Sequence, residues 1–318
     1  MCYHNYNAGG YRPLAMRILR LALSQLFLTV ARGRQERTMI MDASKLCELK
    51  KLTTDVRIGT VEAVYNGKSG HPGGALSSAE VLTYLYFCEM NVDPKNPKME
   101  DRDRFVLSKG HSCPGLYSVL AHRGFFPVED LRLFRKCGSY LQGHPDMKKI
   151  PGVDMSTGSL GQGLSAACGM ALSAKLSDKS YRTYCLVGDG ESQEGQIWEA
   201  AMFAAHYKLD NLCLVVDKNR LQIDGYVEDV MNPNPHDAKF EAFGWHVIVI
   251  DGNDLEAVAN AFEEAKTVKG KPTVILANTI KGKGVSYMED KAEWHGKAPN
   301  EDEYKQAIAE LEAYKATL

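Results

Sequence analysis

The sequence lacks the short motifs that mark several common classes of protein. Its eight cysteines are scattered, and the closest two are 17 positions apart, so no Cys-x-x-Cys pair can bind zinc or form a redox-active dithiol. No two histidines lie three to five residues apart, which excludes the other common zinc pattern. A Gly-x-x-x-x-Gly-Lys-Ser/Thr loop is absent, and Gly158, Gly161 and Gly163 do not have the Gly-x-Gly-x-x-Gly spacing of a dinucleotide site. Nucleotide hydrolysis and hydride transfer therefore lose their usual signatures.

An excess of charge of one sign is also missing. The 38 Lys and Arg residues nearly balance 40 Asp and Glu residues, which gives a net charge of −2 and no global attraction for nucleic acid or an acidic membrane. The apolar run from Leu21 to Ala31 is much shorter than the roughly 20 residues that span a bilayer. Scattered cysteines are typical of reduced, small apolar side chains in the cytosol. We therefore expect a cytoplasmic protein with no nucleic-acid or membrane partner.

The first 40 residues differ in composition from the remainder. They contain six arginines, no lysine and a single acid, Glu36. A signal peptide, a transit peptide and upstream sequence read in frame are the alternatives. Met39 and Met41 directly precede the first clear helix, which favours a mis-assigned start or a disordered segment. We expect residues 1–40 to be a non-conforming head and residues 41–318 to form one domain.

Strands and helices alternate along residues 41–318. The strands are expected at 105–108, 183–187, 213–216, 245–250 and 273–277, each a continuous apolar run typical of a parallel sheet buried on both faces. Residues 67–74 are expected to be a loop, and Ser78 is expected to cap the helix that follows it. Further helices are expected at 45–66, 114–123, 128–136, 162–177, 194–207, 236–243, 254–267 and 301–316. This alternation predicts an α/β fold with a doubly wound, mostly parallel sheet and helices on both faces.

The sharpest local pattern follows the strand at 183–187, where Gly188, Asp189 and Gly190 precede a helix. Ligands of open α/β sheets bind at the carboxyl ends of strands, although Gly-Asp-Gly alone is also a common turn. Asn219 ends the next strand, 30 positions after Asp189, so neighbouring strands should bring the two side chains together. Carboxylate, amide and carbonyl oxygens suit Mg²⁺, which takes its other ligands from phosphate and water. The pair therefore predicts a phosphorylated cofactor.

The segment from Gly188 to Asn219 resembles the thiamine diphosphate motif, and the surrounding sequence resembles the transketolase family. The matching segments occur in the family's order and extend over about residues 45 to 300. They are Ser69-Gly70-His71-Pro72-Gly73, Arg104-Phe105-Val106-Leu107-Ser108-Lys109-Gly110-His111, Thr157-Gly158-Ser159-Leu160-Gly161-Gln162-Gly163 and Trp294-His295-Gly296.

This resemblance implies a role for individual residues of the chain. Asp189, Asn219 and the carbonyl of Leu221 would bind Mg²⁺ or another divalent cation. The catalytic histidines would be His71, His111, His144 and His295. Lys109 is a weaker match, and Ile223 stands where some relatives have a polar cofactor contact. The positions that match cofactor-binding residues are His111, Gly158, Ser159, Leu160, Gly190, Glu194 and Lys281.

The same residues can be interpreted without the family. Each of the four histidines is next to a glycine in an expected loop or strand end, where binding sites concentrate, although a solvated loop histidine is the simpler alternative. His4, His122, His206, His236 and His246 are expected to have no role at the site. Glu191, Glu194 and Glu199 fit acids in the first turns of a helix, and the family adds a subunit contact for Glu194 and Glu199.

The resemblance implies the thiamine diphosphate-binding fold and the N-terminal subunit of a split transketolase. Such an enzyme moves a two-carbon ketol unit from a ketose phosphate to an aldose phosphate, a reaction of the pentose phosphate pathway. No further set of strands follows before Leu318, so a C-terminal partner subunit is expected to supply the pyrimidine-binding domain and an activating glutamate, in a heterotetramer. The alternatives are a deoxyxylulose-phosphate synthase-like or 2-oxo acid dehydrogenase-like subunit, or a non-catalytic relic of the fold.

Overall fold

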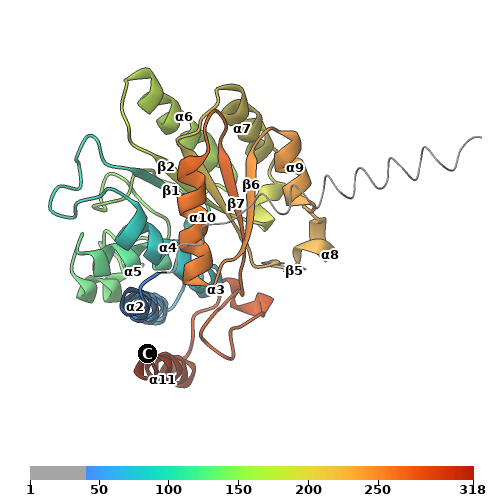
Figure 1. Cartoon of the computed structure of the whole chain (residues 1–318). Coiled ribbons are helices and arrows are strands. Elements are labelled where there is room, and N and C mark those ends of the chain that lie inside the picture. The colour runs from blue at the N-terminus through green and yellow to red at the C-terminus, as the bar shows by residue number, and fades with distance from the viewer. Residues whose placement is uncertain (1–40) are drawn as a thin grey trace, which may run out of the picture. The chain divides into compact units, whose positions relative to one another are not determined.

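Five parallel strands form the central sheet of the part of the chain that the structure, a computed structural model, describes: residues 41–318 (Figure 1). The expectations for residues 1–40 lie outside this part. The strands are ordered β1-β2-β3-β7-β6 across the sheet, and neighbouring strands all run parallel. Their bounds are β1 Arg104–Leu107, β2 Thr183–Gly188, β3 Leu212–Lys218, β6 His246–Asp251 and β7 Thr273–Asn278.

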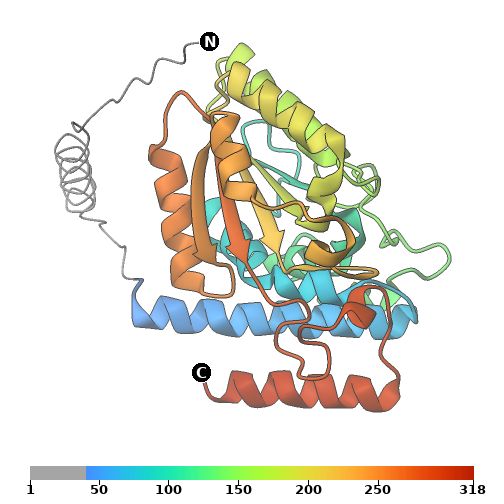
Figure 2. The same cartoon turned by 90° about the vertical axis from the view of Figure 1, so that its right-hand side faces the viewer.

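Helices cover both faces of this sheet, as the alternation of strands and helices predicts (Figures 1 and 2). Successive side chains along a strand point to opposite faces. Thus Leu186 packs in the core that contains residues of α2, α4, α5 and α10, whereas Val187 packs in the core that contains residues of α6, α7 and α9. The bounds of these helices are α2 Ala43–Gly67, α4 Ala79–Tyr84, α5 Cys113–Arg123, α6 Gln162–Leu176, α7 Gly195–His206, α9 His236–Ala242 and α10 Leu255–Thr267.

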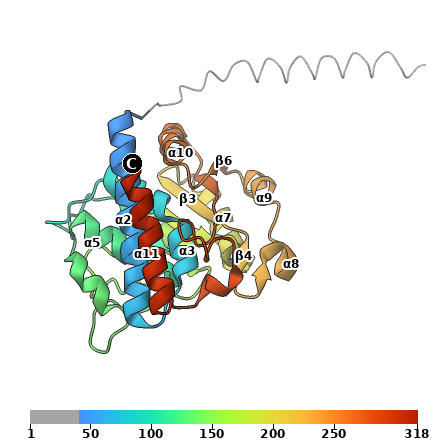
Figure 3. The same cartoon turned by 90° about the horizontal axis from the view of Figure 1, so that it is seen from below.

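The C-terminal helix α11 (Glu301–Ala316) lies beside α2, as Figures 2 and 3 show. The rings of Tyr65 and Tyr304 stack with their centroids 4.1 Å apart, and Leu311 is buried against this layer. Asn300 and Glu303 form a reciprocal capping box that fixes the start of α11. None of the helices within residues 41–318 combines the length and hydropathy that spanning a bilayer requires.

Strand β6 departs from the expected pattern of burial on both faces. It pairs only with β7 and therefore forms one edge of the sheet. Val249 is 56% exposed, and Ile248 is the one buried residue among the six. The expectation that this strand is buried on both faces was wrong, because an apolar run alone does not show which elements will cover the strand.

The segment around Pro72 also differs from the predicted loop, because it contains a short, fully buried helix, α3 (Pro72–Ser77). Proline favours the first turn of a helix, where its missing N–H is not needed. Ser78 does not cap α4 with its side chain; its hydroxyl donates to the carbonyl of Gly74 at 3.0 Å. The expected helix at 128–136 is a 3₁₀ helix over Val128–Leu133 and ends before Arg135, which has a positive φ of 57°.

A small hairpin and a short helix follow β3. Strands β4 (Leu221–Gln222) and β5 (Gly225–Tyr226) pair antiparallel and lead into α8 (Val227–Met231). This hairpin places Leu221 and Gln222 beside the carboxyl ends of β2 and β3, where the candidate site lies.

Candidate active site

A cavity of about 460 Å³ opens at the carboxyl ends of the central strands. Loops after β1, β2, β3 and β7 and the start of α3 all contribute to its walls, so segments distant in the sequence meet there. Ser159 does not line this cavity; it lines a neighbouring hollow with His144 and Gly158. The other twelve predicted site residues are all in its walls: His71, His111, His144, His295, Gly158, Leu160, Gly190, Glu194, Lys281, Asp189, Asn219 and Leu221.

Asp189 and Asn219 present oxygen atoms on one wall of the cavity. The carboxylate of Asp189 accepts hydrogen bonds from the backbone N–H of Gly190 at 2.8 Å and of Arg220 at 2.6 Å. The side-chain oxygen of Asn219 accepts from the N–H of Leu221 at 3.1 Å, and the carbonyl of Leu221 accepts from Lys281 at 3.0 Å. These oxygens lie on adjacent turns after β2 and β3, as the strand order predicts.

Asp189 has no ion-pair partner among the described residues, although the buried ammonium of Lys281 is near enough to attract it. Burial, with the nearby charge of Asp217, raises the pKa of Asp189 to about 6. Within residues 41–318 no Lys, Arg or His forms an ion pair with Asp189. No group of three or more His, Cys, Asp or Glu side chains in that range could hold a metal, so a cation here would depend on one carboxylate with amide and carbonyl oxygens. The donor set therefore fits a cation that takes further ligands from a phosphate group.

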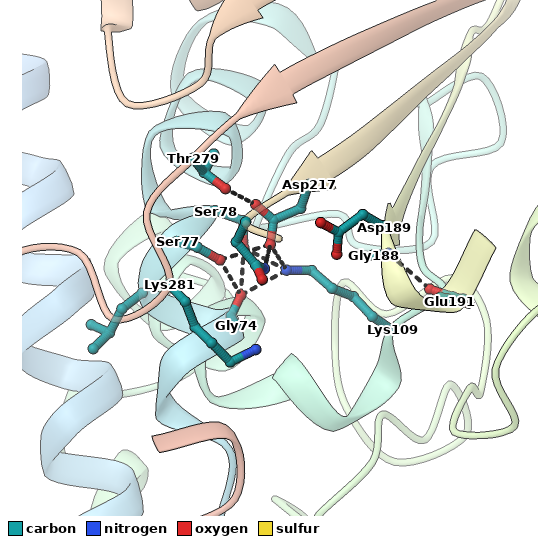
Figure 4. Close-up of polar contacts among 12 residues, drawn as sticks. Gly74, Ser77, Ser78, Lys109, Gly188, Asp189, Glu191, Asp217, Thr279 and Lys281 are labelled. Carbon is teal, nitrogen blue, oxygen red and sulfur yellow. Dashed lines mark hydrogen bonds and ion pairs between the residues drawn. The ribbon is translucent and has the colours of Figure 1, made fainter. Parts of the chain in front are cut away.

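A buried ion pair lies behind this wall (Figure 4). The ammonium of Lys109 lies 2.6 Å from the carboxylate of Asp217, and both side chains are almost fully buried. Asp217 also accepts hydrogen bonds from Ser77, Thr279 and the amide of Asn219. The ion pair thereby links the loop after β1 to α3 and to Asn219, and Lys109 has a larger structural role than its weak sequence match indicates.

Glu191 is a second buried carboxylate, and its role was not recognised from the sequence. It lies in the first turn of the short 3₁₀ helix Gly190–Gln193, as expected, but the residue is only 3% exposed. Its carboxylate accepts hydrogen bonds from Ser108, Gly161 and Gly188, and burial raises the pKa of Glu191. Asp217 was missed as well, although its place at the end of an apolar strand, two residues before Asn219, is a signal that could have identified it.

Three histidines form a triangle in the cavity wall. The ring centroids of His71 and His111 are 5.1 Å apart, those of His111 and His295 are 5.1 Å apart, and those of His71 and His295 are 5.5 Å apart. Nδ1 of His71 and Nδ1 of His295 are buried without a hydrogen-bond partner. Buried polar atoms normally have partners, so these nitrogens are available to a ligand.

These histidines are held in the neutral form. Burial is the main cause that lowers the pKa of His71 to about 4, of His111 to about 2 and of His295 to about 3; each also lies near other positive or titratable groups. Burial lowers the pKa of Lys281 to about 8. Neutral imidazoles can both donate and accept a hydrogen bond, which suits recognition of hydroxyl groups.

The pH dependence of stability should report this triangle. Because the folded pKa values lie below 6.5, the unfolded chain binds protons between about pH 6.5 and pH 4 that the folded chain does not. The free energy of unfolding should fall as pH is lowered through this range, by up to about 1.4 kcal/mol per pH unit for each histidine. His111→Asn should reduce this slope by the contribution of about one titrating histidine. Urea unfolding at several pH values measures the slope. His206→Asn, which changes an exposed histidine, is the control. An unchanged slope in the His111 variant would contradict the assignment.

The remaining predicted residues lie around the mouth of the cavity. His144 is exposed, and a Cβ on Gly158 would come within 3.0 Å of its ring, which explains why this position with a φ of 154° is a glycine. Glu194 is exposed and packs against Gly161. Ile223 is 68% exposed at the rim. None of His122, His206, His236 and His246 lines the cavity.

Comparisons with known proteins agree with this geometry. Residues 49–315 match the family model of the transketolase thiamine diphosphate binding domain. The chain is 48% identical to a 6-deoxy-6-sulfo-D-fructose transketolase subunit from Clostridium sp., over 83% of this chain and 96% of that protein. It is 46% identical to one of the subunits of an apulose-4-phosphate transketolase from Phocaeicola vulgatus, over 79% of this chain and 89% of that protein.

A solved structure gives the same result. The transketolase of Campylobacter jejuni superposes with a TM-score of 0.78 and 37% identity over 83% of this chain, which spans 42% of that longer chain. Fold and site together define an α/β domain of the thiamine diphosphate-binding type. The chain belongs to the transketolase family and corresponds to its N-terminal part.

Proposed function

We propose that this chain is the thiamine diphosphate-binding subunit of a transketolase that is active together with a second subunit. The observation that carries the proposal is one cavity that combines the oxygens of Asp189 and Asn219 with three neutral histidines. The two relatives named as subunits are matched over 96% and 89% of their length, whereas the Campylobacter jejuni transketolase is matched over 42%. This difference supports a split enzyme.

The cavity fits the cofactor at two places. Asp189, Asn219 and the carbonyl of Leu221 would hold Mg²⁺ or another divalent cation, because Asp189 is a buried carboxylate without a paired cation. The diphosphate and thiazolium parts would be held by cavity residues, with Ser159 contributing from the neighbouring hollow: His111, Gly158, Leu160, Gly190, Glu194 and Lys281. Thiamine diphosphate supplies an electron sink for breaking and forming a carbon–carbon bond next to a carbonyl group.

The chain's own residues would bind and orient the sugar. The unpartnered Nδ1 atoms of His71 and His295 can each exchange a hydrogen bond with a sugar hydroxyl or carbonyl. Because these imidazoles are neutral, a free ring nitrogen can accept a hydrogen bond from a sugar hydroxyl or donate one to a carbonyl, and so orient the sugar. His144, exposed at the mouth, would contact the part of the substrate further from the reacting carbon.

The complete reaction would transfer a two-carbon ketol unit from a ketose phosphate to an aldose phosphate. A C-terminal subunit would supply the pyrimidine-binding domain, in a heterotetramer. All cysteines within the described residues are free, which supports a reducing compartment such as the cytoplasm.

Reconstitution tests this proposal. The purified chain should show no ketol transfer by itself and should gain it when mixed with a second subunit, Mg²⁺ and thiamine diphosphate. The reason is that this chain would hold the diphosphate and thiazolium parts of the cofactor, whereas the second subunit would hold its pyrimidine ring. Light scattering of the chain, of its partner and of the mixture reports their association. Full activity of the chain without a partner would overturn the split-enzyme proposal, and decarboxylation of a 2-oxo acid without ketol transfer would favour the alternative enzyme classes.

A further inference from the structure

We propose that Glu191 is a positioning residue that fixes three loops of the cofactor cavity relative to one another. The identity of the ligand rests on the proposed function, but the arrangement of the loops does not. The three loops follow β1, precede α6 and follow β2, and they carry His111, Gly158 and Leu160, and Asp189 and Gly190 respectively.

Both oxygens of the Glu191 carboxylate are used. Oε1 accepts hydrogen bonds from the hydroxyl of Ser108 at 2.5 Å and from the N–H of Gly161 at 2.9 Å. Oε2 accepts from the N–H of Gly188 at 3.0 Å. The hydroxyl of Ser108 in turn accepts from the N–H of Gly163 at 3.1 Å. One buried side chain thus connects all three loops, two of them directly through their backbones and the third through Ser108.

Close packing makes this connection sensitive to small shifts. A Cβ on Gly163 would lie 2.5 Å from Cβ of Ser108, and a Cβ on Gly161 would lie 2.8 Å from Cβ of Glu194. The loops therefore approach each other as closely as their backbones allow. Since Ser108 is three residues from His111, a displacement at Ser108 moves the loop that carries this histidine.

Only a carboxylate satisfies this arrangement. It accepts from two backbone N–H groups and one hydroxyl without offering a donor, whereas a glutamine side chain would direct an NH₂ group at Gly161 or Gly188. The three donors also satisfy the carboxylate oxygens, so few of their lone pairs remain free to face an anionic diphosphate in the cavity. Glu191 lies in the wall of the cavity, but because its oxygens are hydrogen-bonded to the three loops, we infer that it acts on a ligand mainly by positioning them.

The test compares Glu191→Gln with Asp103→Asn in the full chain. Asp103 is a matched control, since it is a buried carboxylate that also accepts from two backbone N–H groups, those of Asn91 and Arg182, both at 2.7 Å, at the opposite end of β1. Hydrogen–deuterium exchange at single amides is measured first without ligand. Binding of thiamine diphosphate with Mg²⁺ is then measured by calorimetry, with and without the second subunit.

Glu191→Gln should accelerate exchange at the amides of Gly161, Gly163 and Gly188 and should weaken cofactor binding by about 10- to 100-fold. Asp103→Asn should accelerate exchange at Asn91 and Arg182 and leave cofactor affinity unchanged. Ser108→Ala, which keeps both backbone contacts of Glu191, should accelerate exchange mainly at Gly163 and provides a milder variant if Glu191→Gln does not fold.

Unchanged exchange at Gly161 and Gly188 in Glu191→Gln, or equal losses of cofactor affinity in the Glu191 and Asp103 variants, would overturn the inference. If Glu191→Gln does not fold, unchanged exchange at Gly163 in Ser108→Ala would overturn it in the same way. A wild-type chain that binds no thiamine diphosphate with or without its partner would instead refute the proposed function. The exchange measured without ligand would still decide whether Glu191 positions the loops, so the two failures are distinguishable.

Discussion

Asp217→Ala should lower the free energy of unfolding by about 3–5 kcal/mol, because it leaves the buried ammonium of Lys109 without its partner. Lys109 would retain only the carbonyl of Gly74 at 2.7 Å and the hydroxyl of Ser78 at 3.3 Å. Thr279 would lose its acceptor as well, whereas Ser77 would keep the carbonyl of Gly74 at 3.1 Å. Urea unfolding of the full chain at neutral pH measures the loss.

The pH dependence separates this ion pair from a simple packing defect. Lys109 and the surrounding hydroxyl groups hold the pKa of Asp217 below its ordinary value of 3.8 despite burial. The stabilisation is therefore present above this pH and is lost as pH falls below it, so wild type and Asp217→Ala should converge in acid. Glu301→Ala, which breaks the exposed Glu301–Lys305 pair, is the control and should change stability very little. A loss for Asp217→Ala as small as that of the control would contradict the assignment.

The strands of the sheet were predictable from the sequence because the feature that produces them, a run of apolar residues, is local. Continuous apolar runs predicted the five strands, and the intervening periodic segments predicted most helices. The errors occur where tertiary contacts decide. Helix α3 is fully buried and too short to show a period, and the exposure of β6 depends on which strand lies beside it.

The residues of the site were predictable only in part. The resemblance to the transketolase family identified twelve residues of the cavity wall, since most of them lie in motifs that are contiguous in the sequence. It did not identify Glu191 or Asp217, whose partners are remote: Ser108 lies 83 positions from Glu191, and Lys109 lies 108 positions from Asp217. The sequence alone does not distinguish an acidic residue that will be buried from one that will be solvated. Only the assembled sheet shows that these two carboxylates connect the loops that carry the site.

Asp189→Ala should give the opposite result to Asp217→Ala. No side chain of residues 41–318 forms an ion pair with Asp189, and the buried ammonium of Lys281, which Asp189 attracts from a distance, would keep the charge of Asp217 nearby and its hydrogen bond to Leu221. Removal of Asp189 should therefore change the free energy of unfolding much less. Its effect should appear in ligand binding. Loss of the charged ligand should weaken Mg²⁺-dependent binding of thiamine diphosphate by more than about 100-fold, beyond what changes to residues behind a metal ligand usually cause. Calorimetry of the reconstituted complex measures the affinity.

The control for Asp189→Ala is Asp224→Ala, because Asp224 is an exposed carboxylate at the mouth of the same cavity. It removes the same charge from the same region but should leave cofactor affinity nearly unchanged, since water solvates this carboxylate whereas Asp189 and Asn219 are buried. Asn219→Ala should be intermediate, as it removes a neutral ligand. Unchanged affinity in Asp189→Ala would refute the cation site, and equal losses for Asp189→Ala and Asp224→Ala would show that the general negative potential of the cavity, and not a specific ligand, controls binding.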